Sequence, residues 1–208
     1  LIKIAKTSMQ SKLISEDSVP LSKLVVDAIL KIVEIDGDKH SVDLDNLKVE
    51  KKSGGSIDDT ALINGIILDK EVVHSGMPTK IEKAGIVLVN TALEVEKTEM
   101  SAEIRISDPT QMQQFLEEEN KMLKLMVEKI HSIGAKVLIC QKGIDDIAQH
   151  YLSKHGILAV RRVKESDMTK LAKATGGRIT TNIDDISAND LGHAEFVQQK
   201  KVESDKWV

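Results

Sequence analysis

Several residues whose side chains could do chemistry lie between Cys140 and His155. Asp146 and His150 are four residues apart, with Asp145 directly before them. On a helix, residues four apart are neighbours on one face, so these two could pair. As a zinc site, however, they would supply only two ligands, and a third would have to come from elsewhere. The alternative is that this segment holds a partner and does no chemistry.

The periodicity of residues 144–154 predicts a helix. Its apolar residues follow the i, i+3, i+4, i+7, i+8 pattern and are expected to pack on a sheet: Ile144, Ile147, Ala148, Tyr151 and Leu152. The polar residues then face outward: Asp145, Asp146, Gln149, His150 and Ser153. Cys140 belongs to the predicted strand "KVLICQ", an apolar setting in which a thiol is usually inert. We therefore interpret the outward residues as a solvated face or a polar binding face, and we expect neither a metal nor catalytic residues.

A second candidate is a long helix predicted over residues 109–132, which would span about 36 Å. Asp108 and Pro109 suit its N-cap and first position. Its second half is densely apolar and is expected to pack on a core: Met122, Leu123, Leu125, Met126, Ile130 and Ile133. Its first half carries Met112, Phe115 and Leu116 and is predicted to extend past the core, where an exposed apolar patch would mark an interaction site. An ordinary long helix with one weakly amphipathic end is the alternative.

Composition excludes several classes of protein. The 208 residues are 41% apolar and 30% charged, with a net charge of −4, which is a poor match to a non-specific nucleic-acid binder. The single Cys cannot form an internal disulfide and fits a reducing compartment. No apolar run reaches membrane-spanning length, and neither a Walker A nor a G-x-G-x-x-G motif occurs. The chain begins without Met and ends in a predicted strand, so we expect a piece of a longer polypeptide.

The order of predicted elements indicates an α/β protein in two parts, divided near residue 63 after the linker-like "KKSGGSIDDT". Residues 1–63 contain a helix at 1–8, a second helix from about Leu21, and short strands around an Asp-Gly turn. The second part alternates strands, "GIILDKEVV", "AGIVLVNTAL", "KVLICQ", "ILAVRRV" and "RITTNI", with helices, including one that Ser166 caps. This alternation predicts a parallel or mixed sheet with helices on its faces.

Specific motifs run almost from end to end of the chain. They include "TSMQSK", "KVEKKSGGSIDDTALINGIILDK", "HSGMP", "AEIRISDPTQMQQFLEEENKML", "CQKGIDDIAQHYLSKHGILAVRRVKESDMTKLAKATGG" and "ISANDLG". With these motifs the chain resembles a group II chaperonin subunit of the archaeal thermosome kind. The resemblance implies that residues 1–63 are part of the intermediate domain and that residues 64–208 are the apical domain, which binds unfolded proteins and forms a built-in lid.

The resemblance also implies roles for particular residues. The client-binding groove would comprise the helix 144–154 and the loop from His74 to Met77, with Asp145, Asp146, Gln149, His150, Ser153, His74 and Met77 as its binding residues. The lid protrusion maps to about Met100–Met122 and includes Met112, Phe115 and Leu116. Lys12 matches the lysine of the family's nucleotide-sensing loop. The implied partners are unfolded proteins and other subunits of a cytoplasmic double ring, without nucleic acid or membrane.

The resemblance implies that the intact parent is an ATPase that uses ATP and Mg²⁺. In the family the phosphate-binding loop and the catalytic residues lie in segments outside this chain. Two rival functions remain. A stand-alone α/β enzyme would need Asp146, His150 and Cys140 to converge in a pocket. A single-partner adaptor would use the long helix to dock one defined partner.

Overall fold

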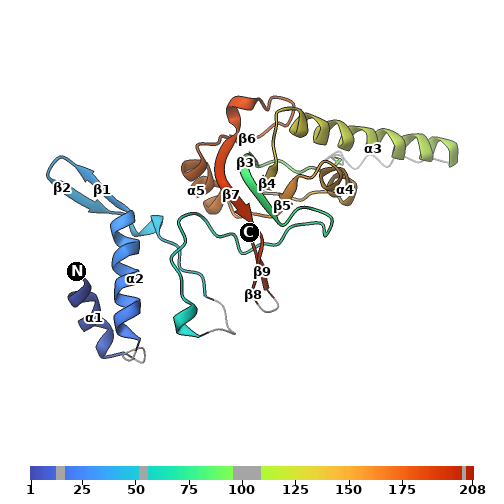
Figure 1. Ribbon diagram of the computed structural model, residues 1–208. Helices are drawn as coiled ribbons and strands as arrows, with labels where there is room; N and C mark the ends of the chain where they lie inside the picture. Colours follow the sequence, from blue (N-terminus) through green and yellow to red (C-terminus); the bar gives the residue numbers. More distant parts are fainter. Residues whose placement is uncertain (13–16, 52–55, 96–108, 203–204) are drawn as a thin grey trace, which may run out of the picture. The chain divides into compact units, whose positions relative to one another are not determined.

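The computed structural model describes residues 1–12, 17–51, 56–95, 109–202 and 205–208, and the side chains of 109–112, 202 and 205 are outside this description. The chain forms two compact units, Leu1–Ile66 and Ile67–Val208 (Figure 1). Within the described residues, no helix combines the length and the apolar character needed to cross a membrane. The assignment of the units to an intermediate and an apical domain stays a prediction.

Unit 1 is a pair of helices followed by a small hairpin. Its helices are α1 (Ile2–Gln10) and α2 (Ser18–Lys31), and the hairpin joins β1 (Val33–Asp36) to β2 (Lys39–Val42). Two 3-10 turns follow, η1 (Leu44–Asn46) and η2 (Ile57–Asp59). The Asp-Gly turn is where the sequence predicts it, and Gly37 takes a φ of +58° that favours glycine. The first helix runs to Gln10, beyond the predicted end at residue 8, and the hydroxyl of Thr7 donates to the carbonyl of Lys3 within it.

Unit 2 is built on a mixed sheet, as the sequence predicts. Strands β3 (Lys80–Val89), β4 (Val137–Cys140), β5 (Leu158–Val160) and β6 (Ile179–Thr180) are parallel in the order β5-β4-β3-β6. Strand β7 (Gly192–Gln198) is antiparallel to β3. Strands β8 (Lys200–Val202) and β9 (Asp205–Trp207) form a separate hairpin.

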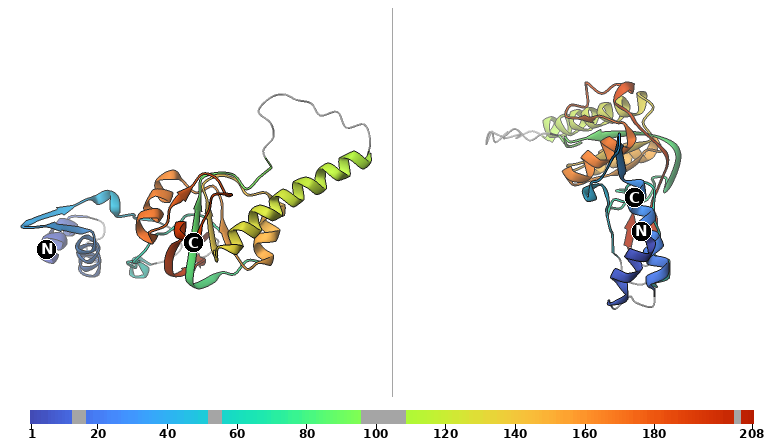
Figure 2. Two further views of the ribbon diagram at one scale, coloured as in Figure 1. Left: turned by 90° about the horizontal axis from the view of Figure 1, so that it is seen from above. Right: turned by 90° about the vertical axis from the view of Figure 1, so that its left-hand side faces the viewer.

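Helices cover the sheet of unit 2 with an aliphatic core between them (Figure 2). They are α3 (Pro109–Ser132), α4 (Asp146–Lys154) and α5 (Glu165–Thr175), with a 3-10 turn η3 at Ala188–Asp190. Val87, Val89 and Leu138 share one core cluster with side chains of α3 and α4. Because side chains alternate across a strand, Ile86 and Leu88 face the other layer, and α5 contacts β3, β6 and β7.

Two local predictions are wrong. Residues 66–73 form no strand, and Leu68 pairs with the chain end there through two backbone bonds to Val208 of 2.6 and 3.2 Å. Helix α5 begins at Glu165 with Lys164 at the N-cap, so Ser166 lies inside the helix. The segment "TEMSAEIRIS" and the proposed cap Asp108 lie outside the described residues.

Candidate functional site

Helix α4 begins later than the sequence predicts, and this changes which residues face outward. Asp145 is its N-cap and accepts a hydrogen bond from the backbone N–H of Ile147 at 2.8 Å. Ile144 therefore precedes the helix, buried in a strand-like bridge with Leu93. Ala148 and Leu152 are buried as predicted, but Ile147 is 41% exposed. The prediction that Ile147 packs on the sheet is wrong.

Gln149 is the clearest correction on α4. Its side chain is only 5% exposed, not outward-facing. The Nε2 group donates to the carbonyl of Ile144 at 2.8 Å and to Oδ1 of Asp146 at 3.0 Å. These bonds satisfy a buried amide and join the first turn of the helix to the residue before it. Gln149 therefore supports α4 from within, and its role in client binding stays a prediction.

The loop that contains His74 lies directly against α4. A backbone turn places the amide of Met77 on the carbonyl of His74 at 3.1 Å, and Nδ1 of His74 accepts from the amide of Gly76 at 3.0 Å. A Cβ atom on Gly76 would lie 2.7 Å from Oγ of Ser153, so a side chain there would collide with α4. The rings of His74 and His150 are edge to face with centroids 6.4 Å apart. The structure thus brings this loop and α4 together, as the sequence predicts.

Met77 does not belong to the exposed part of this loop. Its side chain is 4% exposed and packs in the core cluster of unit 2. The contact of Met77 with clients stays a prediction. A thioether suits such an irregular gap between loop and sheet. The accessible polar groups of the site are Asp146 and His150, with His74, Ser153 and Asp145 partly exposed.

The environment of Cys140 does not favour a reactive thiol. It ends strand β4, is fully buried, and its thiol contacts the carbonyls of Thr91 at 3.2 Å and Gly143 at 3.7 Å. Burial raises the pKa of the Cys140 thiol to about 11, so the reactive thiolate is scarce at neutral pH. Among the residues that the structure describes, no group of three or more His, Cys, Asp and Glu side chains could hold a metal ion.

Helix α3 packs on the core only through one side of its second half. Leu123, Val127 and Ile130 are buried, whereas Met126 and Ile133 are partly buried. Met122 and Leu125 are 45% and 56% exposed, so the prediction that both pack on the core is wrong. Phe115 and Leu116 are 43% and 51% exposed, and the side chain of Met112 lies outside the described residues.

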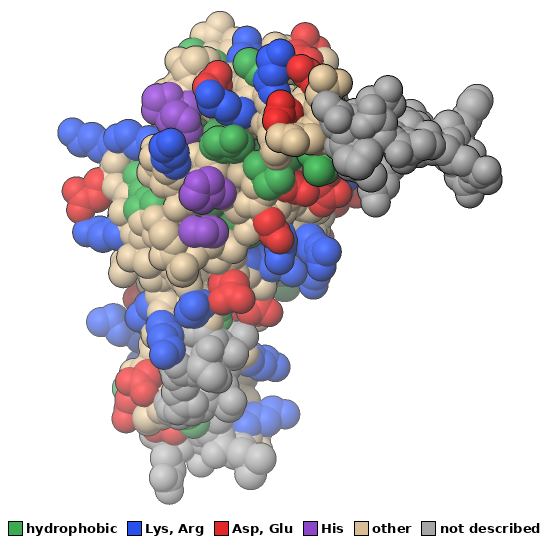
Figure 3. Space-filling model, turned by 90° about the vertical axis from the view of Figure 1, so that its right-hand side faces the viewer, with side chains coloured by type: hydrophobic (Ala, Val, Ile, Leu, Met, Phe, Trp, Pro, Cys, Tyr) green, Lys and Arg blue, Asp and Glu red, His purple; other side chains and the backbone are tan. Residues whose placement is uncertain are grey.

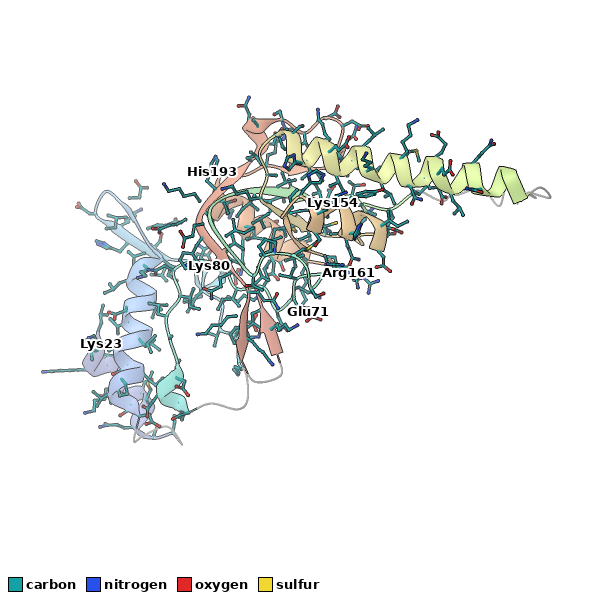
Figure 4. All side chains as sticks on the ribbon, turned by 45° about the vertical axis from the view of Figure 1, so that its right-hand side comes forward. Lys23, Glu71, Lys80, Lys154, Arg161 and His193 are labelled. Atoms are coloured by element: carbon teal, nitrogen blue, oxygen red, sulfur yellow. The ribbon has the colours of Figure 1, made fainter. Side chains whose placement is uncertain are left out.

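The two helices together present a surface of mixed character. Helix α3 packs against α4 and continues beyond it, as Figure 4 shows, where Lys154 marks the last residue of α4. On this face hydrophobic, histidine and charged side chains are interspersed (Figure 3). Met122 and Leu125 of α3 and Ile147 of α4 are exposed apolar residues that sequence reasoning placed against the core or the sheet. Recognising Asp145 as the N-cap would have placed Ile144 before the helix, but the spacing of Ile147, Ala148 and Tyr151 would still have favoured one buried face.

Lys12 belongs to unit 1, whereas helices α3 and α4 belong to unit 2. It is exposed in the turn that follows α1, and its amide donates to the carbonyl of Met9 at 2.9 Å. A single exposed lysine cannot by itself hold a nucleotide and its metal ion.

Comparison with known proteins places the whole chain in one family. The model of the TCP-1/cpn60 chaperonin family matches residues 1–208. The chain is 57% identical to thermosome subunit beta of Saccharolobus shibatae and 56% identical to a thermosome subunit of Pyrococcus abyssi. Each alignment covers 100% of this chain and 38% of the relative.

A solved structure with the same fold gives a consistent result. It is the open-state monomer of a group II chaperonin from Methanococcoides burtonii, with a TM-score of 0.77 and 40% identity. The match covers 99% of this chain and 45% of that one, so this chain spans less than half the length of these relatives. The chain belongs to the TCP-1/cpn60 chaperonin family.

Proposed function

We propose that this chain is the part of an ATP-dependent chaperonin that binds unfolded proteins and carries its lid. The observation that carries this proposal is the exposure of apolar and polar residues on two packed helices, Met122 and Leu125 on α3 and Asp146, Ile147 and His150 on α4. Unfolded proteins expose apolar side chains and unpaired backbone groups, and this surface offers partners for both. The membership of the chain in a chaperonin family supports the same function.

The chemistry of the surface suits partners of many sequences. Methionine and leucine side chains adapt to apolar groups of different shape, and histidine can either donate or accept a hydrogen bond. A surface of this kind selects poorly among sequences, because promiscuous binding relies on contacts that can repack. The buried bonds of Gln149 keep the helix itself rigid while its outer side chains adapt.

The outer half of α3 is proposed to form the lid protrusion. Phe115 and Leu116 are exposed there, and Met112 is the third residue of the predicted patch. In a double ring these side chains would be covered by neighbouring subunits when the lid closes. A surface that is exposed in one state and covered in the other lets the ring alternate between capture and enclosure of a client.

ATP and Mg²⁺ are proposed to bind a part of the parent protein that lies outside this chain. ATP hydrolysis there is proposed to drive lid closure, and the parent is proposed to work in the cytoplasm. Lys12 would sense the nucleotide through its charge. In the full-length protein, Lys12→Ala should disturb the coupling of ATP hydrolysis to lid closure and leave the fold of unit 2 unchanged. Wild-type rates of both hydrolysis and closure would show that Lys12 is an ordinary loop lysine.

Client binding can be tested on the chain itself. The double variant Leu125→Ser/Ile147→Ser should bind several unrelated, chemically unfolded proteins more weakly and suppress their aggregation less than the wild type does. Phe196→Ser is the matched control, because Phe196 is 57% exposed on β7 of the same unit. Equal loss of binding in both variants would indicate non-specific hydrophobic adsorption, and unchanged binding in the double variant would contradict the proposed surface.

The second candidate is an adaptor that docks one partner on α3, for which the exposed Phe115 and Leu116 are a specific observation. A defined partner in a helix-in-groove complex would not be displaced by unrelated unfolded chains. Competition among at least two unrelated unfolded proteins for the same chain supports the chaperonin function, and the absence of competition supports the adaptor.

A further inference from the structure

The dipeptide Asn64–Gly65 combines features that favour a spontaneous reaction of the chain with itself. The sequence contains six asparagines, and only Asn64 is followed by glycine. Both residues are exposed in a bend that belongs to no helix or strand. They lie in unit 1, close to its last residue, Ile66.

Gly65 leaves its backbone nitrogen accessible to the side chain before it. Its φ of +157° is rarely adopted by residues with a side chain, and a Cβ atom there would meet no other heavy atom within 4 Å. In the part of the chain that the structure describes, the N–H of Gly65 has no hydrogen-bond acceptor. No hydrogen bond therefore has to break, and no side chain is in the way, when this nitrogen approaches the side-chain carbonyl of Asn64.

Lys31 supplies a positive charge at the reacting amide. It is the last residue of α2, and its ammonium group donates a hydrogen bond to Oδ1 of Asn64. When a nucleophile adds to an amide carbon, negative charge develops on the carbonyl oxygen. A cation that already contacts that oxygen stabilises the developing charge.

We propose that Asn64 is a self-modification site, at which Gly65 and Lys31 promote deamidation. The backbone nitrogen of Gly65 forms a bond to Cγ of Asn64, the bond from Cγ to Nδ2 breaks, and Nδ2 leaves as ammonia with the proton from Gly65. Water then opens the resulting succinimide at either carbonyl. One opening gives aspartate and the other gives isoaspartate, without any oxidant or reductant.

The modification changes both charge and chain geometry. The aspartate product places a carboxylate beside the ammonium of Lys31, where the unmodified chain has a neutral amide, and the isoaspartate product instead carries its free carboxylate on the α-carbon. Isoaspartate also routes the main chain through the side-chain carbon, which lengthens it by one methylene within the final residues of unit 1. The reaction needs no partner and would accumulate with the age of the molecule.

The test is to incubate the purified full chain at mildly alkaline pH and to follow tryptic peptides by mass spectrometry and chromatography. Asn64 falls in the peptide 53–70, and exposed Asn46, which precedes Leu47, falls in 40–48 and serves as the internal control. Asn64 should convert at least about tenfold faster than Asn46, because glycine offers no Cβ to obstruct ring closure. Conversion of Asn64 at the rate of Asn46 or slower would overturn the site.

Variants separate the contributions of Gly65 and Lys31 to the rate of deamidation. Asn64→Gln should abolish the change in peptide 53–70, and Gly65→Ala should slow it strongly, with circular dichroism confirming that each variant is folded. Lys31→Met should slow conversion while leaving Asn46 unaffected, and an unchanged or faster rate would refute the role of Lys31. If Gly65→Ala does not fold, the comparison of Asn64 with Asn46 in the wild type still decides the proposal.

Discussion

Gln149 shows how a single buried polar residue can join a helix to the segment before it. Its buried amide bonds to the carbonyl of Ile144 and to the carboxylate of Asp146, so it ties α4 to the segment that enters it. Without Gln149 the carbonyl of Ile144 would lose this donor, whereas the exposed carboxylate of Asp146 can bond to water.

We predict that Gln149→Ala destabilises unit 2 by about 1–3 kcal/mol, because it leaves a buried carbonyl without a donor. Urea unfolding followed by circular dichroism measures this change. His150→Ala, on the adjacent exposed residue, is the control and should change stability by no more than about 0.5 kcal/mol. Equal effects of the two changes would mean that the bonds of Gln149 contribute nothing.

Cys140 predicts a specific dependence of stability on pH. Burial raises the pKa of its thiol from 9.0 to about 11. Below pH 9 the thiol is protonated in both folded and unfolded chains and does not affect the pH dependence. Between pH 9 and 11 the unfolded chain loses this proton and the folded chain keeps it, so stability falls as pH rises, by of the order of 2 kcal/mol in total.

The measurement compares the free energy of unfolding of wild type and Cys140→Ala across this pH range. The variant should be less stable by a constant amount at every pH, because it loses some packing. Between pH 9 and 11 its free energy of unfolding should also fall less steeply with pH than that of the wild type, because it has no thiol to titrate. Parallel pH profiles for the two proteins would contradict the raised pKa.

At the scale of elements, the long helix was predictable and the details of α4 were not. Pro109 and Gly134 bracket α3, and its ends are where the sequence predicts them. In a helix as short as α4, the spacing of apolar residues is compatible with more than one buried face. The burial of the single residue Gln149 is enough to change which face packs on the sheet. Periodicity ranks faces by hydrophobicity and therefore misses a polar side chain that the fold satisfies internally.

The segment 66–73 illustrates a different limit. Its sequence is rich in Ile, Leu and Val, which predicts a strand. In the structure Leu68 pairs with Val208, and the amide of Val73 donates to the carbonyl of Ala159. The segment therefore makes isolated backbone hydrogen bonds and not the regular hydrogen-bond ladder of a strand. Such partners are distant in sequence, and local propensity contains no information about them.

The outer half of α3 leads to a prediction for the whole element. Phe115→Ser/Leu116→Ser should change the free energy of unfolding by only about 0.5 kcal/mol, because both side chains are already exposed. Ile130→Ala, in the buried half of the same helix, should cost about 2–5 kcal/mol. Thermal melts of the two variants distinguish them. A double variant that melts as early as Ile130→Ala would show that the outer half is packed.

At the scale of the whole molecule, the two units differ sharply in how much they bury. Among the described residues of unit 1, the buried side chains are Ser18, Ser22, Val26 and Ala28, all on α2. Unit 2 has an aliphatic core shared by its sheet and helices. Since apolar burial is the main favourable contribution to folding, unit 1 has far less free energy to offset its conformational entropy.

We therefore predict that unit 1 unfolds at lower urea concentration than unit 2. Hydrogen exchange resolved by peptide, measured across a urea series, should show that α2 loses protection while β3 and β4 remain protected. Val26→Ala should shift only the first transition, and Ile130→Ala should shift only the second, because each removes packing from one unit. Simultaneous loss of protection in α2 and β3, in the wild type and in both variants, would show that the units fold as one cooperative body. Separate transitions would instead mean that unit 1 can rearrange while the proposed client-binding surface on unit 2 stays folded.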